Sequence, residues 1–317
     1  MEKDRRKEVK VFMGRIAEAL KRAQEERGRR AQQTTSGTDG AMMVDGTSLP
    51  ENSEPFSPED LTDMLRPPSL RDPSRASDLP ELSAAALTAE RVPRSVVAFH
   101  EANSEIAEKY REVRTRLLTS NAEYRPRIFG VSSAWPREGK TVTTANLAFS
   151  LSELRHLQVI MVDFDLRNRG LSRTFQVEDQ PGVAEILRGE KSLSEVCQSL
   201  VRRNLFLVPA GQVNESSMTE LMTGGRAVAL AKELRERFHY GLLDTPPIDP
   251  YADVGLIGAL CNSVMLVIRM NSTPEPVLQK CVKTLQVNNI TVAGGILVGD
   301  LTKSALYEGH GDFAPNF

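Results

Sequence analysis

One stretch of the sequence carries the residue types that bind phosphate groups. After an apolar run, residues 134–141 read AWPREGKT, which matches the P-loop pattern with alanine in place of its first glycine. In such a loop, backbone N–H groups and the N-terminus of the following helix hold phosphate oxygens. The Lys140 ammonium would reach the β- and γ-phosphates, and the Thr141 hydroxyl would bind Mg²⁺. We therefore predict ATP and Mg²⁺ as cofactors, with the nucleotide held by Pro136, Arg137, Glu138, Gly139, Lys140, Thr141 and Val142.

Two later stretches supply carboxylates. Asp163 and Asp165 end an apolar run, and two aspartates separated by one residue at a strand end point to the same side, where they can hold a hydrated Mg²⁺ or take a proton. Asp244 ends another apolar run and is followed by Thr245 and two prolines. The order of these motifs indicates phosphoryl transfer or ATP hydrolysis. We predict Lys140, Asp163, Asp165 and Asp244 as catalytic residues, and Thr141, Asp163 and Asp244 as the metal ligands.

The elements that would position these residues alternate along the chain beyond Arg94. Short, continuously apolar runs predict buried strands at 127–133, 158–162, 205–208, 240–243, 263–268 and 291–298. Longer amphipathic runs predict helices at 141–154, 182–187, 226–238 and 276–286. Strands that are apolar throughout, with helices between them, indicate a parallel sheet covered on both faces. The expected fold is a doubly wound, mostly parallel α/β sheet, whose ligand binds at the carboxyl ends of the strands.

The composition divides the chain into four parts. Residues 1–30 are rich in Lys and Arg and repeat apolar residues at helical spacing, which predicts an amphipathic helical arm. Residues 31–95 are rich in Ser, Thr, Gly, Pro and acidic residues and predict a disordered linker, because too little apolar surface is available to offset the entropy of ordering. The catalytic domain is expected at 96–300, followed by a flexible tail at 301–317.

The overall composition excludes several classes of protein. A net charge of −2 argues against a chain that binds nucleic acid throughout its length. Cys197, Cys261 and Cys281 are far apart and form no C-x-x-C pair, so neither a disulfide framework nor a structural metal is expected. The chain has neither an apolar run long enough for a membrane span nor a secretory signal at its start. These features predict a cytoplasmic location.

Taken together, the motifs resemble those of the bacterial tyrosine kinases of polysaccharide-export systems, a branch of the P-loop ATPases with a deviant Walker A motif. The resemblance covers about residues 97–300 and rests on three stretches: SSAWPREGKT, VIMVDFDLR and LLDTPP. A fourth feature is the spacing of Glu108, Arg111 and Arg114, which looks like the E-x-x-R-x-x-R helix of this family. The resemblance implies that these three residues make subunit contacts in a ring-shaped homo-oligomer. The alternative is a solvated, salt-bridged helix face.

The resemblance also implies an activity and a partner. The chain would be a tyrosine autokinase that regulates exopolysaccharide polymerisation and export. It would act through a membrane protein of the chain-length-determinant class, which would recruit it to the inner face of the cytoplasmic membrane. Lys140 would stabilise the transferred phosphoryl group, and Asp163 would assist the metal or accept the proton of the tyrosine hydroxyl, supported by Asp165.

The sequence departs from the family at two places. The tail contains one tyrosine, Tyr307, where relatives carry a cluster, which makes Tyr307 the candidate phosphoacceptor. Val298 stands where many relatives have an asparagine that reads the adenine. Two other classes therefore stay open. One is a nucleotide-dependent regulator of polysaccharide synthesis without kinase activity. The other is a partition or positioning ATPase. Such ATPases carry a lysine early in the P-loop, but residues 135–137 of this chain are Trp-Pro-Arg, which counts against this class.

Overall fold

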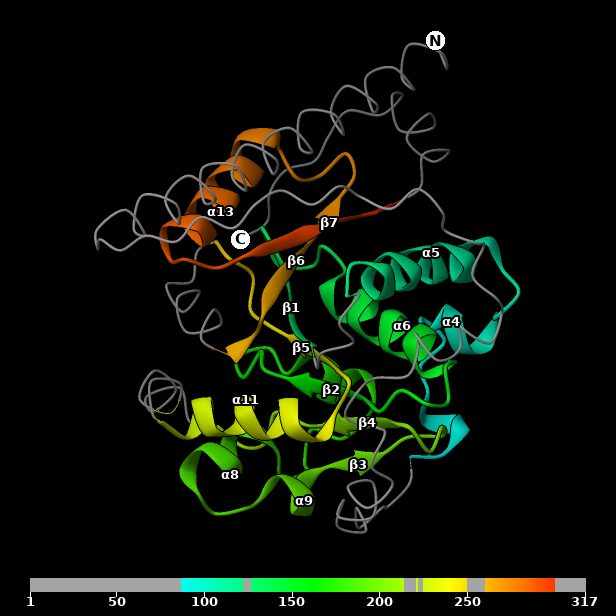
Figure 1. Cartoon of the computed structure of the whole chain (residues 1–317), viewed down its shortest axis with the longest axis vertical. Coiled ribbons are helices and arrows are strands. Elements are labelled where there is room, and N and C mark those ends of the chain that lie inside the picture. The colour runs from blue at the N-terminus through cyan, green and yellow to red at the C-terminus, as the bar shows by residue number, and fades with distance from the viewer. Residues whose placement is uncertain (1–86, 122–126, 214–220, 222–224, 250–259, 300–317) are drawn as a thin grey trace, which may run out of the picture. The chain divides into compact units, whose positions relative to one another are not determined.

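The computed structural model describes residues 87–121, 127–213, 221, 225–249 and 260–299 (Figure 1). The predicted arm at 1–30, nearly all of the predicted linker and the tail with Tyr307 lie outside these residues. The described part of the chain thus begins at Leu87 and contains the whole P-loop region.

A seven-stranded sheet forms the centre of the domain. The spatial order of its strands is β3-β4-β2-β5-β1-β6-β7, and every neighbouring pair is parallel except β3 with β4. The strands are β1 (Arg127–Ser133), β2 (Val159–Asp163), β3 (Gln198–Ser199), β4 (Leu205–Val208), β5 (Tyr240–Asp244), β6 (Ser263–Arg269) and β7 (Val292–Val298). The six predicted strands are present close to their expected positions, and β3 was not predicted because two residues leave no periodic pattern.

Helices cover both faces of the sheet, which confirms the predicted fold class. Figure 1 shows α4, α5 and α6 on one side and α11 and α13 on the other. The longer helices are α5 (Glu105–Thr119), α6 (Lys140–Ser152), α11 (Gly225–Arg237) and α13 (Glu275–Val287). The short ones are η2 (Ala89–Arg91), α4 (Val97–His100), α7 (Gly170–Thr174), α8 (Val183–Arg188) and α9 (Leu193–Val196).

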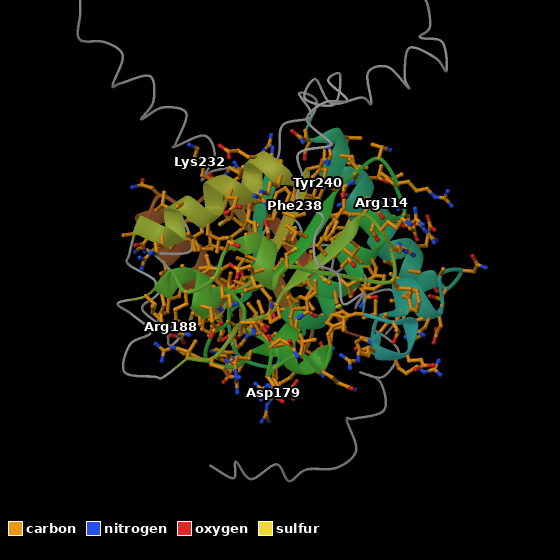
Figure 2. The ribbon with its side chains drawn as sticks, turned by 90° about the horizontal axis from the view of Figure 1, so that it is seen from below. Arg114, Asp179, Arg188, Lys232, Phe238 and Tyr240 are labelled. Atoms are coloured by element: carbon orange, nitrogen blue, oxygen red, sulfur yellow. The ribbon has the colours of Figure 1, made fainter. Side chains whose placement is uncertain are left out.

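The core lies between the sheet and these helices. All residues of β2, β4 and β5 are buried, as expected for strands with helices on both faces. Helix α6 is also buried along most of its length because it lies between the sheet and α5. Figure 2 shows Phe238 and Tyr240 inside the molecule, whereas Arg188 and Lys232 lie at its outer surface.

The folded domain begins earlier than the sequence suggested. Leu87, Val92 and Val96 are buried in the core, and the Leu87 N–H donates a 2.9 Å hydrogen bond to the carbonyl of Ser199 in β3. The predicted linker boundary at residue 95 is therefore wrong, because residues from Leu87 onward belong to the domain. Isolated apolar residues in a polar stretch gave no periodic signal, although each one fills a place in the core.

Candidate functional site

The site lies at the carboxyl ends of three adjacent strands. Strand β1 leads into the P-loop and then into α6, while β2 and β5 end at Asp163 and Asp244. These two aspartates are register partners on neighbouring parallel strands. Parallel strands bring their carboxyl ends to the same edge of a sheet, so motifs separated by many residues meet there.

Two positions in the P-loop have backbone angles that bend the chain around its centre. Gly139 has φ = 95°, in the left-handed region that favours glycine, and directly precedes the first residue of α6. Arg137 also has a positive φ of 63°. The buried Glu138 side chain accepts a 3.0 Å hydrogen bond from the Trp135 N–H, which closes the loop on itself.

Residues outside the loop hold it in this shape. The Glu138 carboxylate also accepts a hydrogen bond from the Thr273 hydroxyl, between β6 and α13. The Arg269 guanidinium donates to the Arg137 carbonyl at 3.0 Å. The end of β6 and the segment after it therefore brace the P-loop through two side chains, and neither Arg269 nor Thr273 was among the predicted site residues.

Lys140 lies among the predicted carboxylates. Its ammonium donates to Asp165 Oδ2 at 2.7 Å and is 3.7 Å from Asp244 Oδ1. Burial disfavours the charged lysine, but the carboxylates of Asp244 and Asp165 outweigh this effect and raise the pKa of Lys140 above its ordinary value. The Asp165 side chain is itself oriented by Asn168, whose backbone and side-chain N–H groups donate to it at 3.1–3.2 Å. Lys140 is therefore a buried cation held by carboxylates at the start of α6.

The predicted metal ligands are close together. The Thr141 hydroxyl donates to Asp244 Oδ2 at 2.7 Å. Asp163 Oδ2 accepts hydrogen bonds from both the backbone N–H and the hydroxyl of Ser172, each at 2.7 Å. The second carboxylate oxygens, Asp163 Oδ1 and Asp244 Oδ1, are buried without a hydrogen-bond partner among the described residues. The sequence did not point to Ser172, which lies in the short helix α7.

The pKa values of Asp163 and Asp244 are both raised above the ordinary value of an aspartate. Burial, followed by repulsion from Asp244, raises the pKa of Asp163 to about 7. Burial also raises the pKa of Asp244 to about 6, although the charge of Lys140 opposes this effect. A raised carboxylate pKa means that the ionised form lacks compensation, which a cation would supply.

These residues fit a Mg²⁺ ion that is completed by phosphate. Mg²⁺ prefers oxygen ligands and is usually bound by one or two carboxylates together with substrate phosphates. Thr141, Asp244 and the unpartnered oxygen of Asp163 offer such ligands. In the part of the chain that the structure describes, no group of three or more His, Cys, Asp and Glu side chains is arranged as a complete metal site. The cysteines Cys197, Cys261 and Cys281 are buried and none of them forms a disulfide within the described residues.

Gly170, the first residue of α7, lies against Thr141 and Asp244, two of the predicted metal ligands. A Cβ atom at Gly170 would lie 2.6 Å from Thr141 Oγ1 and 3.0 Å from Asp244 Oδ2. The first distance is shorter than real Cβ contacts and the second is at their lower limit, so a side chain at this position would displace the two ligands. Gly170 was not predicted, because the sequence pattern does not show which glycine makes a close approach.

The end of β7 also reaches the P-loop. A Cβ atom at Gly139 would lie 3.6 Å from Val298 Cγ2. Val298 therefore lies beside the nucleotide-binding loop, and its side chain has no group that could hydrogen-bond to a base. In the P-loop itself, Pro136 and Arg137 are exposed to solvent. Tyr307 lies outside the described residues.

The predicted oligomer-contact residues have partners within their own chain. Arg111 forms two 3.0 Å contacts with the Glu153 carboxylate and one with Glu108. Arg114 donates to the same carboxylate at 2.5 Å and to the Ser150 carbonyl at 2.6 Å. Glu153, at the end of α6, was not predicted. The salt-bridged face is thus present in the described residues, and the subunit contact stays a prediction.

Comparisons with known proteins identify relatives that are tyrosine kinases. No family profile matches the chain. It is 28% identical over 222 residues to the tyrosine-protein kinase YwqD of Bacillus subtilis (strain 168), covering 70% of this chain and 93% of the relative. It is also 28% identical over 197 residues to a putative tyrosine-protein kinase in the cps region of Klebsiella pneumoniae, but spans only 27% of that relative.

Solved structures of kinase domains have the same fold. The kinase domain of the Escherichia coli tyrosine kinase ETK superposes with a TM-score of 0.62 at 22% identity, covering 70% of this chain and 84% of that domain. The kinase domain of VpsO superposes with a TM-score of 0.53 at 30% identity, covering 61% of this chain and 98% of that domain. Within the described residues, every helix is too short or too polar to cross a bilayer.

Proposed function

Because this chain belongs to the family of bacterial tyrosine-protein kinases, we propose that it transfers the γ-phosphoryl group of ATP to tyrosine. The observation that carries the proposal is the cluster at the carboxyl ends of β1, β2 and β5. There Lys140 and Thr141, at the start of α6, meet the buried Asp163, Asp165 and Asp244. Catalysis of phosphoryl transfer depends mainly on positioning and charge stabilisation, and this cluster supplies both.

The P-loop would bind the phosphates of ATP. Its backbone N–H groups and the N-terminus of α6 favour anions. Phosphate oxygens would then replace Asp165 and Asp244 as partners of the Lys140 ammonium, and the lysine would stabilise the charge on the transferred group. When bound, Mg²⁺ would neutralise charge on the phosphates. Thr141 and Asp244 would hold this ion, with Asp163 beside them.

Asp163 is suited to accept the proton of the tyrosine hydroxyl. Its Oδ1 is buried and has no hydrogen-bond partner among the described residues, and a carboxylate whose pKa is raised by burial can act as a general base. The tyrosine oxygen would form a bond to the γ-phosphorus while the bond to the ADP oxygen breaks, and the proton would pass to Asp163. Asp165 would keep Lys140 oriented until the phosphates arrive.

The wider assignments belong to the same proposal. Tyr307 is the candidate acceptor, presented by another copy in a ring-shaped oligomer to which Glu108, Arg111 and Arg114 contribute. The partner would be a membrane protein of the chain-length-determinant class in exopolysaccharide synthesis, which would hold the chain at the inner face of the cytoplasmic membrane. The name of the Klebsiella relative, which refers to a cps region, supports the link to a surface polysaccharide.

One observation favours a second candidate function. The tail contains a single tyrosine, so little acceptor is available for autophosphorylation. A regulator that binds and hydrolyses ATP, with water in place of tyrosine, would use the same Lys140, Thr141 and Asp244. Such a protein would act through nucleotide-dependent assembly rather than through phosphotyrosine.

Incubation of the purified full chain with γ-labelled ATP and Mg²⁺ distinguishes the two functions. We expect label on tyrosine that is lost in Lys140→Met and strongly reduced in Tyr307→Phe. Lys283→Met is the matched control, because Lys283 is a lysine of α13 that lies outside the site. Release of labelled phosphate without any phosphotyrosine would contradict the kinase function and support the regulator.

A further inference from the structure

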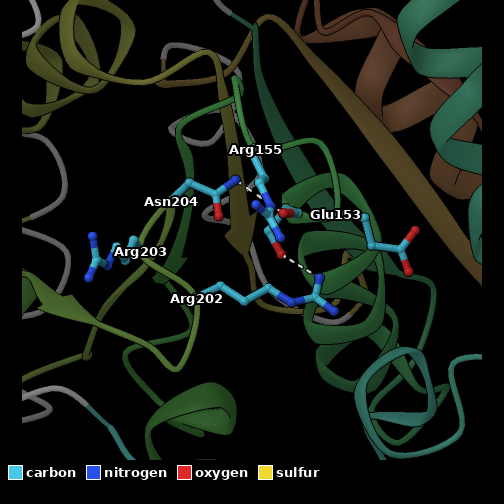
Figure 3. A pocket seen from close by; sticks show the side chains of 6 residues that line it. Glu153, Arg155, Arg202, Arg203 and Asn204 are labelled. Atoms are coloured by element: carbon cyan, nitrogen blue, oxygen red, sulfur yellow. Dashed lines mark hydrogen bonds between the residues drawn. The ribbon is translucent and has the colours of Figure 1, made fainter.

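A cavity lined by polar side chains lies at the opposite end of α6 from the P-loop. It has a volume of about 710 Å³ and is lined by Ser152, Glu153, Arg155, Arg202, Arg203 and Asn204 (Figure 3). The first residues belong to the end of α6 and the turn after it, and the others precede β4. At 1.5 Å per residue, the length of α6 separates this cavity from Lys140 by about 20 Å. The cavity is therefore distinct from the candidate active site.

Several of the lining groups hold the end of α6. The Arg202 guanidinium donates to the Phe149 carbonyl at 2.5 Å and to Ser152 Oγ at 2.9 Å. The Asn204 amide donates to the carbonyls of Ser152, Leu154 and Leu157 at 2.9–3.2 Å. These contacts satisfy carbonyl groups that a helix end leaves without intrahelical partners, and they fix the wall of the cavity.

Two other arginines that line the cavity, Arg155 and Arg203, make no such contacts with the end of α6. Arg155 and Arg203 are exposed, and neither has a hydrogen bond or ion pair within the described residues. The acidic residue that lines the cavity, Glu153, already forms ion pairs with Arg111 and Arg114. Figure 3 shows Glu153 turned away from Arg155, and Arg203 on the far side of Asn204.

The surroundings of the cavity are strongly positive. Burial lowers the pKa of Arg202, and the charges of the nearby Arg111 and Arg114 lower it further, although Glu153 opposes them. Like charges at short range repel each other, and the repulsion increases where water is partly excluded. A bound anion would relieve this repulsion, whereas a cation would add to it.

We propose that this cavity binds the phosphate groups of a ligand, which Arg155 would contact on one side of Asn204 and Arg203 on the other. Arginine offers planar, paired N–H donors that match the geometry of phosphate oxygens, and bonds between two charged groups are the strongest hydrogen bonds in proteins. The volume of the cavity falls in the range of small-ligand sites, so it admits a phosphorylated small molecule as well as the head group of an anionic lipid. Both ligands offer the same chemistry, and the experiment separates them.

The first arm of the test uses inorganic pyrophosphate as the probe. The full chain is saturated with ADP and Mg²⁺ to fill the nucleotide site, and pyrophosphate binding is then measured by titration calorimetry. We expect one site per chain, with affinity that falls as salt is added. The double variant Arg155→Gln/Arg203→Gln should bind at least about tenfold more weakly, because each charge-assisted hydrogen bond contributes at least that factor. Lys283→Gln is the matched surface control and should bind like the parent chain.

The second arm uses vesicles of phosphatidylcholine with and without a phosphoinositide. Flotation of the chain with the phosphoinositide vesicles, lost in the double variant but kept in Lys283→Gln, identifies a lipid as the source of the phosphate. Binding of either probe that depends on Arg155 and Arg203 supports the site. The proposal is wrong if neither probe binds at millimolar concentration, or if the folded double variant binds both as well as the parent chain.

A third measurement tests whether Arg155 and Arg203 contact a neighbouring subunit instead of a phosphate group. If the double variant fails to form the oligomer that the parent chain forms, and neither probe binds, the arginines contact a neighbouring subunit and the phosphate site is excluded. Tyrosine phosphorylation is measured in parallel on the same samples. The phosphate site does not depend on kinase activity, so each can fail without the other.

Discussion

Within the described residues, Asp163 receives its side-chain hydrogen bonds from one residue, Ser172. Both the N–H and the hydroxyl of Ser172 donate to Asp163 Oδ2, and the same hydroxyl accepts from the Ala210 N–H at 2.8 Å. These bonds favour the ionised carboxylate and partly offset the effect of burial on its pKa. Ser172 is therefore a positioning residue, which acts on the reaction through Asp163.

Ser172→Ala should slow the reaction and shift its pH dependence. Without the hydroxyl, the pKa of Asp163 should rise further, so the acidic limb of the pH–rate profile should move to higher pH. We expect kcat to fall about tenfold or more while KM for ATP changes little, since one positioned base contributes factors of about 10² or more. Ser150→Ala is the control, because Ser150 is equally buried but its hydroxyl has no hydrogen-bond partner among the described residues. An unchanged pH profile in Ser172→Ala would contradict this role.

The environment of His239 predicts that the folded protein loses stability in acid. Its Nδ1 accepts a 2.8 Å hydrogen bond from the Gln158 N–H, which requires the unprotonated ring. Burial, followed by the charge of His156, lowers the pKa of His239 to about 4. The unfolded chain, with a pKa of about 6.5, binds the proton more readily. The free energy of unfolding should therefore be unaffected above pH 6.5 and fall by on the order of 1–3 kcal/mol as the pH drops toward 4.

Urea unfolding of the parent chain and of His239→Asn checks this prediction. Asparagine keeps an acceptor near the position of Nδ1 but does not titrate, so the variant should lose less stability between pH 6.5 and pH 4. Carboxylates titrate in both proteins, and the comparison removes their contribution. Equal losses in the two proteins would show that His239 is not responsible.

At the scale of elements, the P-loop depends on the segment between β6 and α13. Thr273→Val would leave the buried Glu138 carboxylate without this partner, which costs about 1–3 kcal/mol, and the loop should relax. We expect weaker ADP binding, by about tenfold or more, while Thr273→Ser should bind ADP like the parent chain. Trp135 is the only tryptophan and lies in this loop, so its fluorescence follows the titration. Equal ADP affinity in Thr273→Val would contradict the bracing role.

The sequence predicted the elements with strong local signals. Six apolar runs predicted the strands of the parallel sheet. The P-loop octet and the aspartates at strand ends predicted that Lys140, Thr141, Asp163 and Asp244 lie together at its edge. The missed residues fall into two groups. Ser172 and Gly170 belong to a five-residue helix, which is too short for a periodic pattern. Glu153 and Thr273 act through partners far away in the sequence, and such contacts appear only when the chain has folded.

At the scale of the whole molecule, Cys197, Cys261 and Cys281 are all buried in the hydrophobic core. Burial raises the pKa of Cys197 to about 12 and of Cys261 and Cys281 to about 11. The thiolate is the reactive form, so none of them should react with Ellman's reagent at pH 8 in the native protein. All three should react once the chain is unfolded in guanidinium chloride. Rapid reaction of one thiol under native conditions would mean that its part of the core opens readily.

The position of Val298 beside Gly139 has a kinetic consequence. The chain leaves β7 at the P-loop, and the sequence from Gly299 to Tyr307 can extend over at most about 30 Å. A tether of this length corresponds to a local concentration in the millimolar range. If Tyr307 is modified by its own chain, diluting the protein should leave the half-time of labelling unchanged. If neighbouring chains exchange tails, the half-time should lengthen once dilution separates the subunits, so a dilution series reads out the order of the reaction.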